Sequence, residues 1–319
     1  MDSSSIEIIK YTPDLKSVWN NFVESSKNGT FLFNRAYMDY HSDRFQDNSY
    51  IFFLKEKPYC LFPACRKENV LSSHAGLTYG GLIMDKACTA SGILNVFSLL
   101  LRSAKEEGIN EIIYRPVPYI YHIVPSEEDL YALFRNEAIL TGRNISSTVD
   151  LHRLIKARKD RTASVKKAFR NDVYVRESKD YESFWKILED NLAMTHGVKP
   201  VHSLEEFKKL VQDFPDNIKL WGAFKNDRMI GGVICYYTKN TVHTQYISAS
   251  PEGKKYGAID IIITFLIEYR LIEENPGIRY FDLGTSNLGY GRILNESLIY
   301  QKEGFGGRAV CFDTYKIIL

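Results

Sequence analysis

The spacing of hydrophobic residues changes repeatedly along the chain and predicts an alternation of strands and helices. In the first half, apolar residues recur at helical spacing over residues 15–23 and 91–107, and the second stretch ends at Gly108. Runs with the length and composition of strands occupy residues 6–11, 50–55, 59–65, 70–77 and 111–114. The first half therefore predicts a strand, one or two helices, three antiparallel strands, a helix and a closing strand.

The second half of the chain repeats this order. A basic helix is predicted over residues 160–171. The expected strands are residues 173–177, 219–224, 229–238, 241–250 and 278–283. The expected helices are residues 180–194, 203–214 and 258–274, and a loop is expected over 251–257.

Weak internal similarity accompanies the repeated order. Residues 52–55 (Phe-Phe-Leu-Lys) correspond to residues 222–225 (Gly-Ala-Phe-Lys), and Cys65 corresponds to Cys235, at an offset of about 170 residues. We therefore expect a duplication, with an N-terminal domain over 1–150 and a C-terminal domain over 151–319.

The composition is that of a folded protein without a dominant charge. Of the 319 residues, 45% are hydrophobic and 25% are charged, and 41 Lys and Arg face 39 Asp and Glu, giving a net charge of +2. This excludes a disordered chain and gives no reason to expect DNA as a partner. The acidic residues near the N-terminus and the shortness of the apolar runs predict no secretory signal and no membrane span, hence a cytoplasmic protein. No oligomeric state follows from the sequence.

Several common catalytic and metal-binding patterns are missing from the sequence. It contains no GxxxxGK[ST], HExxH or GxSxG motif. The five cysteines include no CxxC pair, and the histidines lack the spacing of a helical metal pair. We expect no metal site.

The order of elements resembles the GNAT acyltransferase fold, and three stretches make the resemblance more specific. Residues 161–168 (Arg-Thr-Ala-Ser-Val-Lys-Lys-Ala), 280–284 (Tyr-Phe-Asp-Leu-Gly) and 300–307 (Tyr-Gln-Lys-Glu-Gly-Phe-Gly-Gly) are similar to the FemAB-like branch. That branch includes the aminoacyltransferases that build peptidoglycan cross-bridges. The resemblance implies an α+β fold of two tandem GNAT-like domains, each a mostly antiparallel sheet flanked by helices, and an acyltransferase activity.

The resemblance places a donor site in the loop that precedes the helix from residue 258. In GNAT enzymes this loop holds the pyrophosphate of CoA, and backbone N–H groups at a helix N-terminus suit phosphate. The residues in question are Lys254, Lys255, Tyr256, Gly257 and Ala258. Lys254 and Ile259 depart from the family pattern, so a solvated surface turn is the alternative. We expect no tightly bound cofactor, with acyl-CoA as a candidate co-substrate.

Lys302 and Asp282 are the candidate catalytic residues. The resemblance implies that Lys302 stabilises the oxyanion formed when an amine attacks an acyl ester, although Gln301 replaces the aromatic residue of the family pattern. Asp282 lies near the carboxyl end of a predicted strand, before Gly284, where it could orient or deprotonate the amine. The alternatives are a solvated lysine at a strand end and an aspartate that caps its own turn.

Further polar and aromatic residues are candidates for substrate binding. Arg35 and the stretch that contains His74 and Tyr79 resemble those holding the acceptor in family members, and Arg and Tyr there suit a nucleotide or sugar phosphate. Arg115, at the end of a predicted strand, is a further candidate. Tyr246 and Ser248, on the strand before the donor loop, are expected to line the acyl channel. Each of these residues could instead be structural.

A basic segment raises the question of a nucleic-acid partner. Residues 152–176 contain nine Lys and Arg but only two acidic residues. Contact with the phosphates of aminoacyl-tRNA is one interpretation and a solvated helix face is the other.

The sequence thus predicts an N-acyl or aminoacyl transferase acting on an amine of a cell-envelope precursor or sugar nucleotide, with the acceptor between the two domains. Acyl-CoA and aminoacyl-tRNA are both candidate donors. A non-catalytic binding protein that keeps the fold but has lost the donor site is the alternative from another functional class.

Overall fold

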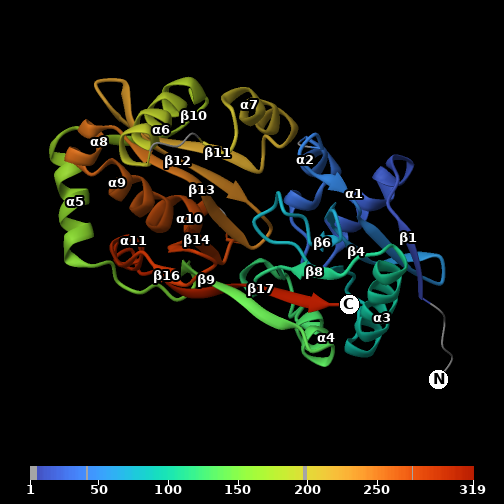
Figure 1. The fold of residues 1–319 in the computed structure, drawn as a ribbon. Coiled ribbons are helices and arrows are strands. Elements are labelled where there is room, and N and C mark those ends of the chain that lie inside the picture. Colours follow the sequence, from blue (N-terminus) through green and yellow to red (C-terminus); the bar gives the residue numbers. More distant parts are fainter. Residues whose placement is uncertain (1–5, 41, 197–199, 275) are drawn as a thin grey trace. The chain divides into compact units, whose positions relative to one another are not determined.

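The computed structural model describes residues 6–40, 42–196, 200–274 and 276–319, and the chain divides into two compact units (Figure 1). The first unit comprises Met1–Ile145, Asn287–Ile293 and Cys311–Leu319. The second comprises Ser146–Ser286 and Leu294–Val310. Each unit is therefore assembled from segments that are distant in the sequence.

The first unit contains mostly short strands and four α-helices among its described residues. The strands are β1 (Ile6–Lys10), β2 (Gln46–Asp47), β3 (Tyr50–Leu54), β4 (Lys57–Phe62), β5 (Cys65–Lys67), β6 (Val70–Ser72), β7 (Ile83–Met84), β8 (Glu111–Tyr114), the first part of β9 (Ile139–Asp150), β15 (Asn287–Leu288) and most of β17 (Arg308–Ile318). The helices are α1 (Lys16–Ser25), α2 (Arg35–Asp39), α3 (Ala90–Glu106) and α4 (Glu128–Arg135), with 3₁₀ turns at Pro13–Leu15, Phe31–Phe33 and Tyr119–Tyr121.

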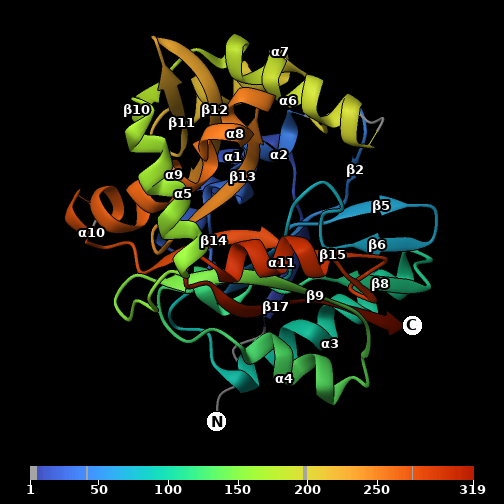
Figure 2. The ribbon, with the colours of Figure 1, turned by 90° about the vertical axis from the view of Figure 1, so that its left-hand side faces the viewer.

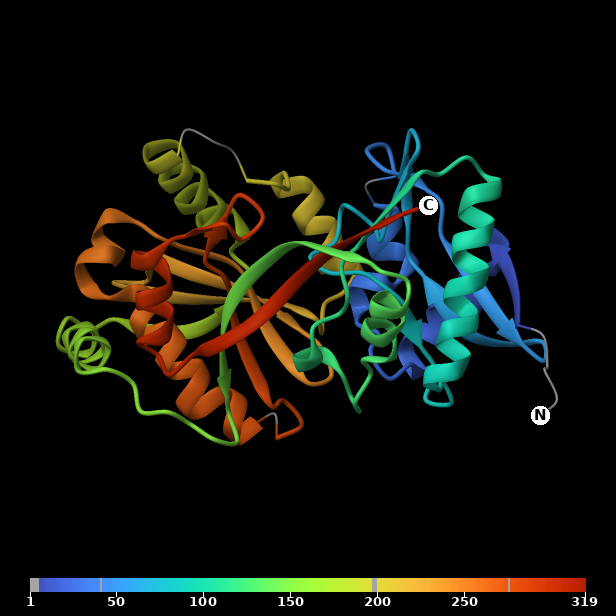
Figure 3. The same ribbon diagram turned by 60° about the horizontal axis from the view of Figure 1, so that its bottom comes forward.

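Two groups of strands form the first unit's sheets. One has the order β1-β3-β4-β7, and in the other β17, β8, β6, β5 and β2 are successive neighbours. Helix α3 buries Ile93, Phe97 and Leu100 in the core, and α4 lies beside it (Figure 2). Within this unit, β9 and β17 run side by side (Figure 3), and Arg143 of β9 pairs with Asp313 of β17.

The second unit contains one sheet covered by helices. Its strands are β10 (Tyr174–Ser178), β11 (Ile218–Lys225), β12 (Arg228–Tyr237), β13 (Thr241–Ala249), β14 (Tyr280–Thr285) and the end of β9, in this spatial order. Its helices are α5 (Lys159–Arg170), α6 (Tyr181–His196), α7 (Leu204–Asp213), α8 (Pro251–Tyr256), α9 (Ala258–Phe265), a π-helical turn (Leu266–Arg270), α10 (Leu271–Glu274) and α11 (Glu296–Glu303). The short β16 (Ile293–Leu294) pairs with β15.

Helices cover both faces of the second sheet. Alternate residues of β12 face opposite ways: Gly232 lies against Phe184 of α6, whereas Val233 packs in the core that contains Ile261 of α9. The two helices are seen on the two sides of the strands in Figure 1. Most neighbouring strands are antiparallel, but β13 and β14 are parallel, and this pair positions the candidate site.

The predicted fold class, a mixed α+β fold with mostly antiparallel sheets and flanking helices, is confirmed.

Corresponding hairpins occur in both units. The β3–β4 turn has positive φ at Lys55 and Glu56, and the β11–β12 turn has positive φ at Asn226 and Asp227. These are the two-residue turns that match the twist of paired strands. The division at residue 150 stays a prediction, although segments after residue 286 contribute to the first unit.

Several predicted elements differ from the structure. The loop expected over 251–257 is wrong, because Pro251–Tyr256 form helix α8, capped by the Ser250 hydroxyl and ended by Gly257 at φ +76°. The strand expected over 70–77 ends at Ser72, close to His74 with its positive φ. The helix expected over 258–274 is interrupted by the π-helical turn. No helix in the described ranges is long and apolar enough to cross a membrane.

Candidate functional site

The centre of the candidate site is Asp282 in the interior of β14. Its neighbours Phe281 and Leu283 belong to the hydrophobic core, so strand alternation turns Asp282 to the opposite face of the sheet. The carboxylate is 0% exposed, and the register places Asp282 beside His243 of β13 and Thr148 of β9. An aspartate buried so completely must be compensated by its neighbours.

The compensation comes from hydroxyls, a backbone N–H and an imidazole. Oδ1 accepts hydrogen bonds from the hydroxyls of Ser146 and Thr148, the latter at 3.1 Å, and from the N–H of Gly284 at 3.2 Å. Oδ2 lies 2.8 Å from Nδ1 of His243. Burial acts to raise the pKa of Asp282, but these hydrogen bonds and the charge of His243 outweigh it and lower the pKa below the usual value. Asp282 is therefore ionised at neutral pH.

Lys302 lies next to this cluster, on helix α11. Its Nζ donates to the carbonyl of Gly284 at 2.9 Å and to that of Thr285 at 2.8 Å. The residue is 8% exposed, and burial lowers the pKa of Lys302 to about 8 while the charge of Asp282 acts in the opposite direction. Lys302 is thus a buried helical residue, and the alternative of a solvated lysine at a strand end is wrong.

The imidazole of His243 and the ammonium of Lys302 both lie close to Gly284. Its φ is +80°, which a glycine adopts without strain. A Cβ at this position would lie 3.5 Å from Cε1 of His243 and 3.8 Å from Nζ of Lys302. The two side chains therefore flank one point beside the Gly284 backbone.

Three buried hydroxyls next to cluster residues in the sequence have no hydrogen-bond partner among the described residues. They belong to Ser147, Thr244 and Ser286. Since buried hydroxyls in native proteins are normally paired, these three are polar groups that the described part of the fold leaves unsatisfied.

The predicted donor residues lie on α8 and at the start of α9. Lys254 and Lys255 are exposed, and Lys254 donates to Asn191 of α6. Gly257 and Ala258 are buried. A Cβ on Gly257 would come within 2.4 Å of the Ser164 hydroxyl, so helix α5 covers this turn.

The first turn of α9 also carries a buried carboxylate. Asp260 accepts from Arg161 at 2.7 Å and from Ser164 at 2.9 Å, both on α5. The ring of Tyr256 lies 5.1 Å from Nζ of Lys225. The N-terminus of α9 is therefore already occupied by charge and by packing from the same unit.

Tyr246 and Ser248 lie on β13, as predicted, and both are largely buried. The Tyr246 hydroxyl is 2.5 Å from Nδ1 of His202, its ring packs edge-on against Trp185, and burial raises the pKa of Tyr246 to about 12. Ser248 donates to the carbonyl of Ile187 on α6 at 3.3 Å.

Two of the predicted acceptor residues make structural contacts in the first unit. The Arg35 guanidinium pairs with Asp39 at 2.6 Å and Asp47 at 2.9 Å and lies 3.8 Å from the Tyr11 ring centroid. Tyr79 is 2% exposed and its hydroxyl donates to Thr30. The charge of Arg35 is thus compensated within the fold.

The structure brings the other two acceptor candidates together. Nη2 of Arg115 donates to the carbonyl of His74 at 2.8 Å. Burial lowers the pKa of Arg115, and the ionisable groups that act against it are Cys65 and Tyr290, neither of which is a carboxylate. Within the described part of the first unit, Arg115 is a partly buried cation without a carboxylate partner.

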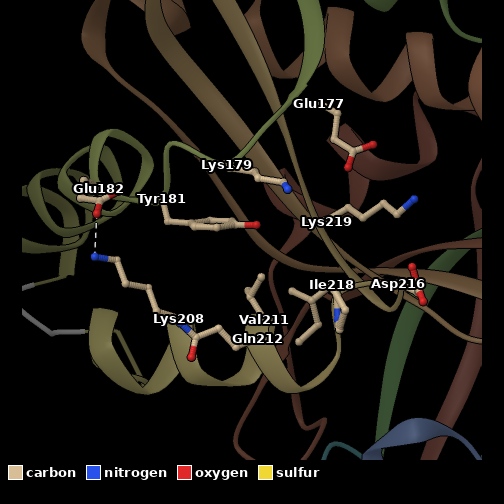
Figure 4. A pocket seen from close by; sticks show the side chains of 11 residues that line it. Glu177, Lys179, Tyr181, Glu182, Lys208, Val211, Gln212, Asp216, Ile218 and Lys219 are labelled. Atoms are coloured by element: carbon tan, nitrogen blue, oxygen red, sulfur yellow. Dashed lines mark ion pairs between the residues drawn. The ribbon is translucent and has the colours of Figure 1, made fainter.

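A surface pocket of about 600 Å³ opens at the other edge of the second unit's sheet. Figure 4 shows the Tyr181 ring of α6 facing Val211 of α7 and Ile218 of β11, and the Lys208–Glu182 ion pair at one side. Its acidic and basic side chains balance, and most of them are exposed. Across the described ranges, no group of three His, Cys, Asp or Glu is placed to hold a metal ion.

Comparison with known proteins supports the GNAT interpretation of this region. Residues 153–292 match the family model described as an acetyltransferase (GNAT) domain. No curated protein matches the sequence. The His243–Asp282 pair therefore lies within the stretch that matches this family model.

Solved structures with the same fold cover nearly the whole chain. FemX aligns with a TM-score of 0.69 and 11% identity over 98% of this chain and 97% of its own. L-PGS from Bacillus licheniformis aligns with a TM-score of 0.61 and 12% identity over 96% of this chain and 92% of its own. A tandem GNAT protein from the clavulanic acid biosynthesis pathway aligns with a TM-score of 0.53 and 10% identity over 98% of both chains. The predicted FemAB-like, tandem GNAT fold is confirmed.

The structure places Asp282 and Lys302 in one cluster, and it adds His243, which the sequence did not indicate. His243 is 39 positions from Asp282 in the chain, and no motif joins the two. The signal that could have found it is the parallel pairing of the strands around residues 243 and 282, because it sets a histidine beside a buried aspartate. The roles of all the predicted site residues stay predictions.

Proposed function

We propose that this chain is an N-acyltransferase that transfers an acyl or aminoacyl group to the amine of a cell-envelope precursor or sugar nucleotide. The observation that carries the proposal is the buried ammonium of Lys302 beside the His243–Asp282 pair in a GNAT-type domain. Such a grouping offers a cation for a developing oxyanion and a titratable pair for the amine proton.

Lys302 is suited to stabilise the tetrahedral intermediate. An ammonium group has three N–H donors, and two of them point at the carbonyls of Gly284 and Thr285. These carbonyls fix the direction of the third N–H, for which no acceptor is found among the described residues. A donor oriented before the reaction stabilises an oxyanion without the cost of reorganisation.

An aminoacyl ester is the donor that the local structure favours over acyl-CoA. A CoA pyrophosphate at the start of α9 would require the backbone around Gly257, which α5 covers through Ser164. It would also lie next to the carboxylate of Asp260 in the first helical turn. Both features oppose phosphate binding at a helix N-terminus. The exposed lysines of α5, including Lys166 and Lys167, suit the phosphates of a charged tRNA.

Arg115 is the residue proposed to hold an anionic group of the acceptor, such as a phosphate. It lacks a carboxylate partner in the described part of its unit, whereas Arg35 has two. A guanidinium without a compensating carboxylate binds a phosphate or carboxylate through paired N–H donors.

The decisive experiment offers the purified full chain a panel of donors and acceptors. The donors are tRNA charged with labelled amino acids and, separately, labelled acetyl-CoA. The acceptors are an amino sugar linked to uridine diphosphate and a lysine-containing peptide. We expect labelled amide, identified by mass spectrometry, from charged tRNA, and about 100- to 1000-fold less from Lys302→Ala.

Two results would contradict the proposal in different ways. Product from acetyl-CoA alone would overturn the choice of donor and leave the acyltransferase in place. Binding of an acceptor without turnover from either donor would support a non-catalytic binding protein. A fold check by circular dichroism on Lys302→Ala separates lost chemistry from lost structure.

A further inference from the structure

The pairing of β13 with β14 fixes the orientation of the His243 imidazole. The parallel register sets His243 opposite Asp282, and paired residues of neighbouring strands project to the same face. Oδ1 of Asp282 is already used by Ser146, Thr148 and the N–H of Gly284. Oδ2 lies 2.8 Å from Nδ1 of His243.

The ionisation of Asp282 determines which ring nitrogen carries the proton. An ionised carboxylate can only accept, so Nδ1 must donate its proton to Oδ2. In the neutral ring the lone pair then resides on Nε2. No hydrogen bond involves Nε2 in the part of the chain that the structure describes.

Of the two partners, only the histidine can reach a substrate. The side chain of His243 is 15% exposed, whereas that of Asp282 is 0% exposed. A carboxylate without accessible surface cannot take a proton from an amine directly. The role open to Asp282 is to orient the imidazole and to stabilise the imidazolium that forms when it accepts a proton.

His243 and Lys302 lie beside the same point of the backbone, at Gly284. Cε1 of His243, which adjoins Nε2 in the ring, and Nζ of Lys302 both lie within 3.8 Å of the position a Cβ on Gly284 would take. The titratable groups next to His243 are thus Asp282 on β14, Lys302 on α11 and, across the register, Tyr236 on β12. A base and an oxyanion donor at one centre are the pair of groups that acyl transfer to an amine requires.

We propose that His243 is the general base of this enzyme and that Asp282 is its positioning residue. The inference rests on the proposed acyl transfer. Nε2 takes a proton from the acceptor amine as the nitrogen forms its bond to the acyl carbonyl carbon, whose oxygen becomes the oxyanion beside Lys302. When the oxyanion collapses, the bond to the leaving oxygen breaks, and the imidazolium returns the proton to that oxygen. The products are an amide and a free hydroxyl, and the histidine is regenerated.

Lys302 is the competing candidate for the base, since burial lowers its pKa. A base must turn a lone pair toward the amine. A neutral Lys302 would keep two N–H groups on the carbonyls of Gly284 and Thr285, and its lone pair would then be free to face the amine. The conservative change Lys302→Arg separates the two assignments, because a guanidinium keeps the positive charge but cannot act as a base near neutral pH.

The first test reads the imidazole directly and needs no donor or acceptor. Nitrogen NMR of the full chain with labelled histidine rings reports the protonation of each ring nitrogen, and His243→Asn identifies the signals of residue 243. We expect a protonated Nδ1 and an unprotonated Nε2 in the neutral ring. A neutral ring protonated at Nε2 would overturn the assignment.

The second test compares two nucleophiles. His243→Asn keeps an N–H donor toward Asp282 but has no basic nitrogen, so it is a close structural match. With charged tRNA and the lysine-containing peptide, whose strongly basic nitrogen gives up its proton slowly without a base, we expect kcat to fall by about 100- to 10,000-fold. With hydroxylamine, whose much less basic nitrogen loses its proton readily to water in the same step, we expect a much smaller loss. Lys302→Arg should reduce both reactions by the same factor.

The outcomes separate this inference from the proposed function. If the wild-type chain forms amide and His243→Asn is equally active, the base assignment fails and the acyltransferase stands. If the variant loses both nucleophiles to the same extent, His243 has a structural role. If the wild-type chain forms no amide, the proposed function itself fails, whatever the NMR result.

Discussion

The chemistry of single residues in this protein is set by burial, and Lys302 shows the consequence most directly. Burial lowers its pKa to about 8, so the ammonium loses its proton as the pH rises through that value. Because the charged form is the one proposed to stabilise the oxyanion, we expect kcat to fall on the alkaline side from about pH 8. The measurement is the pH dependence of kcat for the wild type and for Lys302→Arg.

The arginine variant is the control for this pH dependence. Its guanidinium keeps its proton throughout the accessible range, so the fall near pH 8 should vanish even if the variant is slower overall. A fall that persists with unchanged midpoint in Lys302→Arg would assign the alkaline titration to another group.

A second residue-scale prediction concerns stability and Asp129 in the first unit. Asp129 is 3% exposed, accepts a hydrogen bond from Tyr114 at 2.7 Å, and burial raises its pKa to about 7. The folded chain therefore retains a proton that the unfolded chain releases between about pH 4 and pH 7. Stability falls as the pH rises through this window, by on the order of 4 kcal/mol in total.

Asp129→Asn removes the titrating group while keeping an oxygen that accepts from Tyr114. Urea unfolding of the wild type and the variant at several pH values measures the effect. The variant should lose the decline in the free energy of unfolding that the wild type shows between about pH 4 and pH 7. Parallel pH profiles for the two proteins would contradict the raised pKa of Asp129.

At the scale of elements, helix α11 presents Lys302, and Arg158 fastens that helix. The Arg158 guanidinium donates to the carbonyl of Tyr300 at 2.7 Å and lies 3.5 Å from the Tyr300 ring centroid, while its backbone N–H donates to Gly304. Arg158→Ala removes the side-chain contacts, and we expect kcat to fall by about tenfold, as for a lost hydrogen bond from a charged donor. KM should change little, because Arg158 contacts α11 alone among the proposed catalytic elements.

Steady-state kinetics with thermal unfolding as a companion measurement tests the role of Arg158. Arg158→Lys, which keeps a charged donor but loses the planar stacking, should fall between wild type and alanine. An alanine variant with unchanged kcat would show that α11 holds Lys302 in place without this contact.

The sequence predicts elements well where one face is continuously apolar and poorly elsewhere. The helix expected over 91–107 is α3, and the strand expected over 111–114 is β8. By contrast, β9 and β17 are long strands in which exposed, half-buried and buried positions do not alternate regularly, so no simple pattern marks them. The sequence does not predict helix α8, because Pro251 and Gly253 indicate a turn, although Pro suits the first turn of a helix.

The sequence also predicts only part of the candidate site. Asp282 follows from its place near the end of a predicted strand, and Lys302 from the resemblance of residues 300–307 to the FemAB-like branch. His243 and Ser146 come from strands whose pairing is set by the whole sheet, and the sequence does not display that pairing. Local pattern thus predicts the residues, while the hydrogen-bond network around Asp282 depends on tertiary structure.

At the scale of the whole molecule, the repeated order of elements predicts two domains, but the compact units are not continuous in sequence. The C-terminal segment Cys311–Leu319 belongs to the first unit. There Tyr315 and Ile317 pair with β8, Lys316 forms an ion pair with Glu111, and Ile317 is 3% exposed in the core. A cut at residue 150 therefore removes a strand from the sheet of the first unit.

This arrangement predicts how fragments of the chain behave. A fragment of residues 1–150 leaves one edge of β8 unpaired and exposes the core around Ile112, so we expect it to aggregate or to unfold without a cooperative transition. A fragment in which residues 1–145 are joined to 311–319 by a long flexible Gly/Ser linker restores the β17 strand beside β8. This fragment should show a cooperative unfolding transition. Thermal unfolding followed by circular dichroism compares the two, with the linker fused to a scrambled 311–319 segment as the matched control. Cooperative unfolding of the 1–150 fragment alone would show that β17 is dispensable and that the first half of the chain folds as an independent domain.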